Sequence, residues 1–120
     1  MKRIIGILLL YFLFTAQTVP QFPVSNLDLK YYLPEEYKAH KQNWAVIEDK
    51  RGILYFGNTI GVLEFDGHNW RLICLPKNAI VRSLAIDKKG KIYVGSRGEF
   101  GYLKPDSIGK MIYVSMTDKI

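Results

Sequence analysis

The residue types best suited to chemistry in this sequence are two histidines and two aspartates. His40 and His68 lack the spacing of a metal-ligand motif, and neither is accompanied by the pattern of a nucleophile and its base. Asp49 and Asp87 are the candidates for a carboxylate pair or a calcium site, but the alternating acids of a calcium loop, ending in glutamate, are absent around them. The sequence therefore predicts no catalytic residue, metal site or cofactor, and we expect that the chain is not an enzyme.

The only cysteine, Cys74, lies within the apolar run at residues 70–75. A lone thiol forms no internal disulfide, and no metal-ligand spacing surrounds it. We therefore expect Cys74 to be a small buried hydrophobic residue.

The two aspartates occupy equivalent places in an internal repeat. Residues 47–57 align with residues 85–95 at an offset of 38, which matches four pairs: Asp49 with Asp87, Gly52 with Gly90, Tyr55 with Tyr93, and Gly57 with Gly95. In an Asp-x-x-Gly turn the aspartate accepts hydrogen bonds from backbone N–H groups, and the glycine takes the left-handed conformation. We therefore expect Asp49 and Asp87 to fix hairpins.

Short apolar runs separated by turn residues fill the chain from Trp44 onward. The expected strands are 44–47, 53–56, 62–65, 70–75, 81–86, 91–94, 100–103 and 111–115. The remaining residues of the repeat motif are Gly61, Asp66, Gly67, Trp70 and Gly101. The pattern predicts an all-β fold of two four-stranded antiparallel repeats, preceded by an extended lead-in at residues 19–43 with a short turn at 33–36.

The period of this repeat is typical of a β-propeller. It lies near the ~40 to 50 residues of a propeller blade and outside the patterns of helical repeats. We interpret residues 44–79 and 80–116 as two blades, in which Gly57 and Gly95 permit close approach of backbone and the aromatic residues pack against the neighbouring blade. The alternative, two hairpins in a small sandwich, does not require the matched aspartate, glycine and tyrosine positions.

Two blades are too few for a closed ring, because propellers usually have ~4 to 8 blades and repeat arrays need about three repeats for stability. We therefore expect a partial propeller. On this interpretation the chain is a fragment whose blades continue beyond Ile120, and residues 117–120 are its truncated end.

Residues 1–18 have the layout of a secretory signal peptide. Lys2 and Arg3 form a positive start, residues 4–14 carry no charge, and residues 15–18 are small or polar, which suits cleavage after Ala16 or Thr18. The apolar run is shorter than the ~20 residues that span a bilayer. We expect export to the periplasmic or cell-surface side of the membrane.

The charge distribution argues against a nucleic-acid partner. The formal net charge of +6 falls to +4 without Lys2 and Arg3, and the basic residues include turn-like pairs at 50–51 and 88–89 instead of following one face of a helix. Residues 91–95 and 97–103 are similar to the two aromatic strands of an RNA-binding domain, but they are adjacent, with no helix between them, and Glu99 interrupts the second motif.

Candidates for ligand contact are of two kinds. Four aromatic residues offer faces for sugar stacking, although inter-blade core is the commoner role of such residues in strands: Trp44, Trp70, Tyr102 and Tyr113. Arg97, Glu99 and Asn58 are better candidates in kind because we expect them in exposed loops. The sequence does not identify the ligand or the end of the sheets to which these residues belong.

Residues 43–58, followed by 61–67 and Trp70, resemble the opening blade of the two-component regulator propeller family. Residues 81–87, 90–95 and 98–103 resemble the blade that follows, so the resemblance covers about residues 43–115. It implies a periplasmic sensor, often of carbohydrate, that is followed by a triple-tyrosine immunoglobulin-like domain, a membrane helix and a cytoplasmic histidine kinase or helix-turn-helix domain. This sequence contains none of those later segments, so the resemblance assigns the membrane tether and the signalling output to missing chain.

Two other functions remain open at the level of sequence, since fold alone does not decide function. One is an exported structural or adhesion propeller without signalling. The other is a propeller enzyme such as a glycan lyase or hydrolase, which requires acids, or a tyrosine and histidine pair, that converge from several blades.

Overall fold

The structure is a computed structural model, and it describes residue 3 and residues 28–119. The predicted signal peptide at residues 1–18 lies outside the described residues except for Arg3, as does the first part of the predicted lead-in. The chain divides into two units, residues 1–30 and 31–120, and the second contains all the strands described below. No helix in the described part of the chain is long and apolar enough to cross a bilayer.

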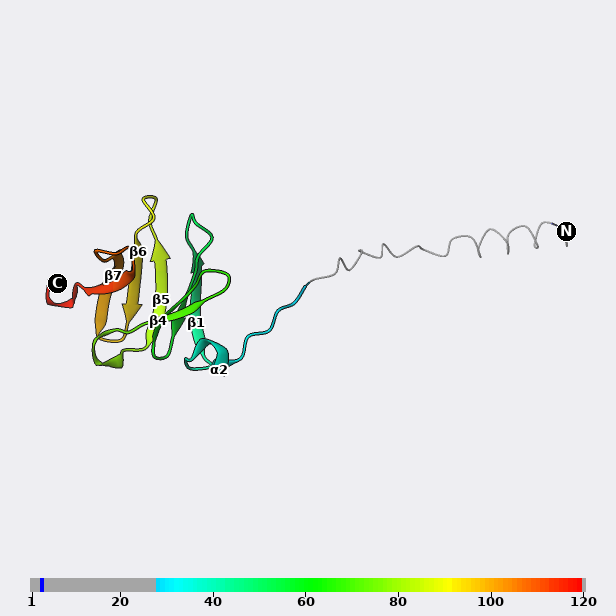
Figure 1. The fold of residues 1–120 in the computed structure, drawn as a ribbon, viewed down its shortest axis with the longest axis horizontal. Helices are drawn as coiled ribbons and strands as arrows, with labels where there is room; N and C mark the ends of the chain where they lie inside the picture. Colours follow the sequence, from blue (N-terminus) through cyan, green and yellow to red (C-terminus); the bar gives the residue numbers. More distant parts are fainter. Residues whose placement is uncertain (1–2, 4–27, 120) are drawn as a thin grey trace. The chain divides into compact units, whose positions relative to one another are not determined.

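The second unit is built from eight strands in two four-stranded antiparallel sheets, and neither sheet is closed (Figure 1). The first sheet contains β1 (Asn43–Glu48), β2 (Leu54–Asn58), β3 (Gly61–Phe65) and β4 (Trp70–Ile73). The second contains β5 (Val81–Ile86), β6 (Ile92–Ser96), β7 (Glu99–Pro105) and β8 (Met111–Ser115). Within each sheet every strand pairs with the next along the chain, which confirms the prediction of two four-stranded antiparallel repeats.

Three short helical segments accompany the strands: α2 (Pro34–Tyr37), η1 (Pro76–Asn78) and η2 (Thr117–Lys119). The first lies where the sequence predicts a short turn. Proline at the start of α2 and of η1 suits a helical first turn, since its missing N–H is not needed there.

The repeat extends into the strand register. Ile47 pairs with Tyr55 in the first sheet, and Ala85 pairs with Tyr93 in the second, so the paired positions differ by the same offset of 38. The register also shifts once near the start of β1, between Asn43 and Ala45, and at the equivalent place near the start of β5. The two sheets therefore share a backbone irregularity that the sequence did not reveal.

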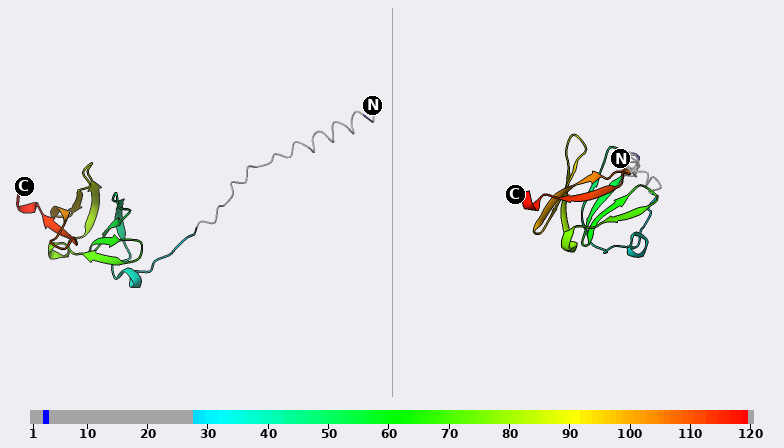
Figure 2. Two further views of the ribbon diagram at one scale, coloured as in Figure 1. Left: turned by 45° about the horizontal axis from the view of Figure 1, so that its top comes forward. Right: turned by 60° about the vertical axis from the view of Figure 1, so that its left-hand side comes forward.

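The first sheet packs one face against the second sheet, with β5 beside β1 (Figures 1 and 2). The core between them consists of Tyr55, Val62, Ile73, Leu75, Val81, Ile92, Val94 and Leu103. Gly57 is needed at this contact, because a Cβ there would lie 2.9 Å from Cγ1 of Val81. Such dense contact is typical of protein interiors, where an added methyl group forces its neighbours to move.

The opposite face of the first sheet is covered by the lead-in. The Trp70 ring stacks on Phe65 with 4.2 Å between ring centroids, and Tyr32 and Tyr37 each lie 5.3 Å from the Trp70 ring. Trp70 is thus a packing residue, as expected, but it packs against the lead-in and not between the two sheets. Paired aromatic rings at such distances stabilise a core beyond the area that they bury.

The prediction for Cys74 is wrong: its side chain is exposed. Ile73 and Leu75 are both buried, at 5% and 4% exposure, so the residue between them faces away from the core. Strand β4 also ends at Ile73, two residues earlier than predicted.

Candidate functional site

The sheets have two ends, and each carries a different set of polar side chains. The turn rim is the end formed by the hairpin turns at residues 49–52, 66–69, 87–90 and 106–109. The loop rim is the opposite end, formed by residues 58–61, 96–99, η1 and η2. Most of the residues predicted from the repeat motif lie on or next to the turn rim, whereas Arg97 and Glu99 lie on the loop rim.

At the turn rim the predicted aspartates bind their own turns. Oδ1 of Asp49 accepts hydrogen bonds from the backbone N–H groups of Arg51 and Ile53, at 2.9 and 3.1 Å. Oδ1 of Asp87 accepts from Lys89 and Lys91, both at 2.9 Å. The glycines that close these turns, Gly52 and Gly90, have φ values of 80° and 85°, in the left-handed region that glycine tolerates.

A third turn of the same kind was missed by the sequence analysis. Oδ1 of Asp106 accepts from the N–H groups of Ile108 and Lys110, at 3.0 and 2.8 Å, and Gly109 has a φ of 84°. The signal was the same Asp-x-x-Gly spacing, but it lies in the β7–β8 hairpin. The first repeat has a different turn at that hairpin, in which Asp66 accepts from His68 and Asn69 at 2.8 and 2.7 Å and Gly67 has a φ of 102°.

Hydrogen bonds within the turns hold the carboxylates of Asp49, Asp66 and Asp87 in the charged form. The backbone hydrogen bond from Lys91 lowers the pKa of Asp87, and the one from Asn69 lowers the pKa of Asp66. Burial acts to raise the pKa of Asp49, but the hydrogen bonds from Arg51 and Ile53 outweigh it and lower the pKa overall. None of these groups is therefore suited to act as a general acid near neutral pH.

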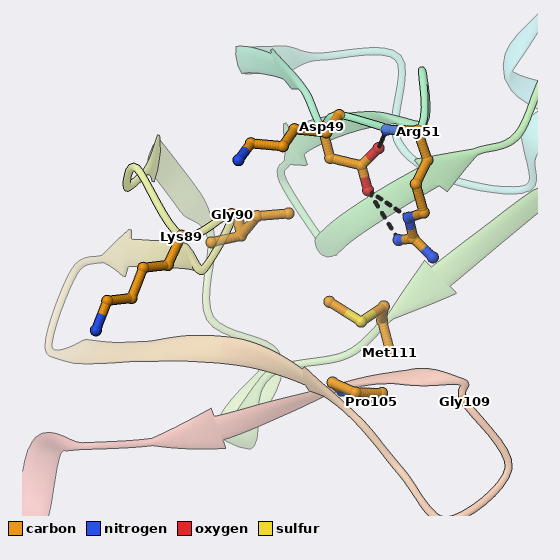
Figure 3. Close-up of a pocket in the computed structure, with 9 residues that line it drawn as sticks. Asp49, Arg51, Lys89, Gly90, Pro105, Gly109 and Met111 are labelled. Atoms are coloured by element: carbon orange, nitrogen blue, oxygen red, sulfur yellow. Dashed lines mark hydrogen bonds and ion pairs between the residues drawn. The ribbon is translucent and has the colours of Figure 1, made fainter.

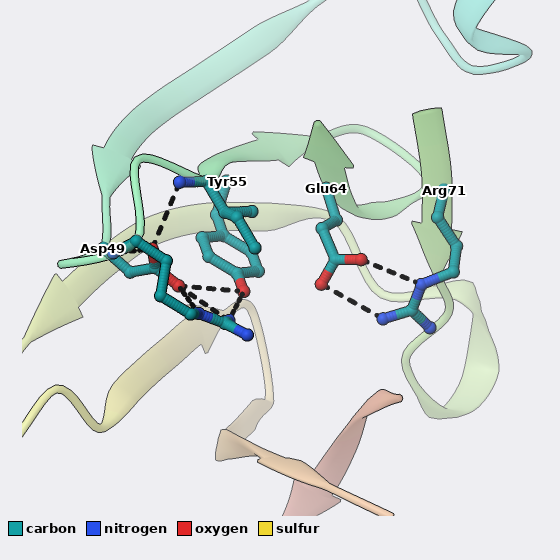
Figure 4. Close-up of polar contacts among 6 residues, drawn as sticks. Asp49, Tyr55, Glu64 and Arg71 are labelled. Carbon is teal, nitrogen blue, oxygen red and sulfur yellow. Dashed lines mark hydrogen bonds and ion pairs between the residues drawn. The ribbon is translucent and has the colours of Figure 1, made fainter. Parts of the chain in front are cut away.

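Each predicted tyrosine is tied to the aspartate of its own repeat. The hydroxyl of Tyr55 lies 3.4 Å from Oδ2 of Asp49, and that of Tyr93 lies 3.5 Å from Oδ2 of Asp87. In the first repeat Arg51 adds an ion pair to Asp49 at 2.8 Å and a hydrogen bond to the Tyr55 hydroxyl at 3.1 Å (Figure 4). Burial raises the pKa of Tyr55, so this phenol remains neutral.

A second ion pair lies on the same face of the first sheet (Figure 4). Nε of Arg71 donates to Oε1 of Glu64 at 3.0 Å, and Nη2 donates to Oε2 at 3.1 Å. Both side chains are partly buried, and the two-pronged geometry ties β3 to β4. The pairing depends on the β3–β4 register, which places Glu64 opposite Arg71 and which the sequence analysis did not resolve.

A hollow of about 290 Å³ lies at the turn rim between the two sheets (Figure 3). Ile92, Pro105 and Met111 provide apolar lining, and Lys50, Arg51 and Lys89 provide cations. The ammonium group of Lys50 donates to the carbonyl oxygen of Lys88, the equivalent residue of the next repeat, at 3.2 Å. The one carboxylate in the lining, Asp49, is already engaged by Arg51, so this hollow offers no acid for chemistry.

At the loop rim, the expectation that Asn58 is exposed is wrong. Its side chain is fully buried. Nδ2 donates to the carbonyl oxygen of His40 at 2.6 Å and to Oδ1 of Asn43 at 2.8 Å, while Oδ1 accepts from the N–H groups of His40 and Ile60, both at 3.2 Å. Asn58 therefore fixes the lead-in to the first sheet and is not a ligand candidate, because buried polar groups with all their bonds made are structural.

The other two ligand candidates line a single hollow of about 380 Å³ at the loop rim. Its lining is drawn from four segments: η1, the β6–β7 hairpin, the end of β8, and η2. The lining residues are Pro76, Lys77, Ala79, Arg97, Gly98, Glu99, Ser115, Thr117 and Asp118. Arg97 and Glu99 are thus brought together, along with Lys77 and Asp118, which the sequence analysis did not single out.

Hydroxyl groups hold the carboxylate of Glu99. Its Oε1 accepts from the Tyr113 hydroxyl at 2.8 Å and from Oγ of Ser115. The Tyr113 ring lies over Gly101, where a Cβ would be 2.6 Å from Cζ of the ring, so this glycine makes room for it. The hydrogen bonds from Ser115 and then Tyr113 lower the pKa of Glu99, which is therefore charged at neutral pH.

The remaining aromatic candidates are already in contact with cations. The Arg82 guanidinium lies 3.9 Å from the centre of the Trp44 ring, and Nε1 of Trp44 donates to Oγ1 of Thr59 at 3.4 Å. The ammonium group of Lys91 lies 3.8 Å from the centre of the Tyr102 ring. These contacts are worth roughly 0.5–1 kcal/mol at exposed sites and occupy one face of each ring.

Within the part of the chain that the structure describes, neither histidine belongs to a metal site. Residues 28–119 contain no group of three His, Cys, Asp or Glu side chains placed to hold a metal ion. Nδ1 of His40 accepts from the N–H of Gln42 at 3.2 Å, and His68 lies in the turn fixed by Asp66. Comparison with known proteins gives no further guidance, since the chain matches no protein-family model, no curated protein and no solved structure.

Proposed function

We propose that the two sheets are consecutive blades of a β-propeller, and that the chain is an exported, ligand-sensing segment of a membrane-linked signal-transduction regulator. The observation that carries the proposal is a sheet face that is covered in the first repeat and open in the second. The face of the first sheet that holds Tyr55 and Gly57 is covered by the second sheet, while the equivalent face of the second sheet, with Tyr93 and Gly95, is open in the part of the chain that the structure describes.

The composition of that open face supports a third blade. Strand pairing places Tyr93, Phe100 and Tyr102 on it together, and the rings of Tyr93 and Phe100 are stacked 6.4 Å apart. Phe100 and Ile112 are each 38% exposed. A two-sheet sandwich has polar outer faces, whereas a contiguous apolar face on one sheet indicates that another element packs there.

The relation between the two sheets also favours blades over a sandwich. Equivalent strands lie next to each other, β1 with β5 and β4 with β8. The bond from Lys50 to Lys88 likewise joins equivalent residues of successive repeats. Repeats that follow one another by a constant rotation produce this pattern, and the radial repetition of propeller blades is one form of it.

The proposed role is binding and not catalysis. The turn carboxylates bind the main chain, whereas a hollow at the loop rim brings together unpaired charges of both signs. The signal-peptide pattern at residues 1–18 supports export. The membrane tether and the output domain belong, in this proposal, to the rest of the full-length protein.

The coding sequence beyond the codon for Ile120 tests the proposal. We expect further segments with Asp-x-x-Gly and Tyr-x-Gly at a period near 38 residues, then a membrane helix and a kinase or helix-turn-helix domain. Further blades without a membrane helix or output domain would favour a structural or adhesion propeller. Absence of any further blade would overturn the sensor and the propeller together.

The location outside the cytoplasm has a separate test. Residues 1–30 joined to alkaline phosphatase, an enzyme that needs an oxidising compartment for its disulfides, should give active enzyme in a bacterial host. The matched control replaces Leu8, Leu9 and Leu10 with Gln. Activity that survives this replacement, or no activity with the unchanged segment, contradicts export.

A further inference from the structure

The loop-rim hollow lies at a place where the two repeats differ in chemistry. Positions 58 and 61 of the first repeat are Asn and Gly, and the equivalent positions 96 and 99 of the second are Ser and Glu. In the first repeat Asn58 is buried and binds the lead-in. In the second, Oγ of Ser96 only closes its own hairpin, by donating to the carbonyl oxygen of Glu99 at 3.1 Å, and a hollow opens beside it.

The acidic side of this hollow is held in position by the protein itself, without a ligand. Glu99 is held by the hydroxyls of Tyr113 and Ser115, which are neutral groups, so the carboxylate keeps its full negative charge. Asp118, from η2, adds a second carboxylate to the lining. Within the described residues neither carboxylate has an ion-pair partner within 4 Å.

The basic side consists of Lys77 and Arg97. Both line the hollow, and neither forms an ion pair within the described residues. Lys77 and Asn78 have successive φ values of 57° and 51°, a left-handed conformation that is uncommon for residues other than glycine and that surrounding structure must maintain. The hollow thus contains two cations and two carboxylates that remain unpaired with each other.

We propose that this hollow binds a small zwitterion, a molecule that carries one ammonium and one carboxylate group, such as an α-amino acid or a dipeptide. The ligand carboxylate binds Arg97 and Lys77, since guanidinium groups bind carboxylates through paired hydrogen bonds. The ligand ammonium binds Glu99 and Asp118. The inference rests on the proposed binding role, and the volume of about 380 Å³ lies in the range of pockets that hold small molecules.

The charges of the lining favour this class over sugars. A neutral sugar offers no charged group to either side of the hollow, and a simple anion or cation binds only one side while it faces two like charges on the other. A zwitterion satisfies both sides without a net change in charge. The binding free energy should therefore depend on both charged groups of the ligand, each through charge-assisted hydrogen bonds.

Nuclear magnetic resonance titration of the full chain, labelled with ¹⁵N, tests the proposal directly. The probes are L-alanine, L-alanyl-L-alanine, the N-acetylated dipeptide and the C-amidated dipeptide. We expect saturable shifts in the amide signals of residues 97–99 and 117 with a zwitterionic probe, and at least about tenfold weaker binding when either charge is capped. The affinities for L-alanine and for the dipeptide are compared, because the ammonium and carboxylate groups lie farther apart in the dipeptide. The tighter binder shows which separation of the two charges the hollow accepts.

Two variants and a control locate the site. Arg97→Gln removes a turn side chain that makes no ion pair, and should weaken binding at least about tenfold without loss of signal dispersion. Glu99→Gln should weaken it similarly; if this variant fails to fold, Arg97→Gln alone carries the test. Arg82→Gln, at the arginine that lies over Trp44, is the matched control and should bind as the unchanged chain does.

Three results would overturn the inference: equal binding of capped and uncapped dipeptides, no saturable shift with any zwitterion up to about 10 mM, or undiminished binding by Arg97→Gln. Glucose and galacturonate are titrated in parallel. Saturable binding of a sugar at these residues, without binding of a zwitterion, also overturns it but leaves the proposed sensing function standing. The sensing function is tested separately, by the coding sequence beyond the codon for Ile120.

Discussion

The two rims of the molecule use polar side chains in opposite ways. At the turn rim, three Asp-x-x-Gly turns have nearly identical hydrogen bonds, and each aspartate binds the backbone of its own turn. At the loop rim, the first repeat is closed by the buried Asn58 while the second has the charged hollow around Glu99. The polar residues that the two repeats share stabilise the fold. The polar residues that remain available to bind a ligand lie where the repeats differ.

The largest effect should come from the closed part of the loop rim. Asn58→Ala leaves four polar partners without their bonds, two of them on the backbone of His40, and we expect a loss of about 2–4 kcal/mol in the free energy of unfolding. Ser96→Ala, the equivalent change in the second repeat, removes one hydroxyl bond and should cost less than about 1 kcal/mol. Urea denaturation measures the free energy of unfolding of both variants. Equal losses would contradict the distinction between the two repeats.

At the turn rim, the stability lost when an aspartate is replaced should increase with the number of contacts that the aspartate makes. Asp49→Ala loses two backbone bonds, the ion pair with Arg51 and the contact with the Tyr55 hydroxyl, and should cost about 2 kcal/mol. Asp106→Ala loses only the two backbone bonds and should cost about 1 kcal/mol. Should Asp106→Ala be the more damaging variant in urea denaturation, the account of the turns is wrong.

Lowering the pH should remove the stability that the turn-rim aspartates contribute. The folded-state pKa values of Asp49, Asp66 and Asp87 are all lowered, so protons bind these groups more readily in the unfolded chain. Their contribution to stability is complete above the unfolded value of about 4 and is lost as the pH falls through the lower folded values. Denaturation midpoints measured between about pH 6 and pH 2 should fall less steeply for Asp87→Asn than for the unchanged chain. Parallel curves would contradict this prediction.

The smallest effect should come from the open part of the loop rim. Arg97→Gln should change the free energy of unfolding by less than about 0.5 kcal/mol, because the guanidinium makes no ion pair in the described part of the chain. The same variant is expected to weaken zwitterion binding. A large loss of stability in urea would instead assign Arg97 to the fold.

The turn rim could be predicted from sequence because its interactions are local. An aspartate and a glycine three residues apart determine one turn by themselves, so Asp49 and Asp87 were identified without knowledge of the rest of the fold. The third turn at Asp106 was missed because it lies in another hairpin, outside the offset that aligned the first two.

The loop rim could not be predicted because its interactions are not local. The burial of Asn58 depends on the lead-in, which folds back so that His40, 18 residues earlier in the sequence, contacts Asn58. The exposure of Cys74 depends on which neighbours face the core, and the hollow depends on four segments that meet only in the folded chain. Residue type suggested Arg97 and Glu99 as candidates, but only the structure brings them together with Lys77 and Asp118.

The central claim, that the two sheets are successive units of an open array, has a direct test. Residues 80–116 are duplicated after residue 116, so that a second copy of the second repeat can cover the face of Tyr93 and Phe100. In an open array each added repeat contributes one more interface, so the account predicts a single cooperative unfolding transition at a higher urea concentration than in the unchanged chain. An unchanged midpoint, or a separate transition for the added repeat, would contradict it.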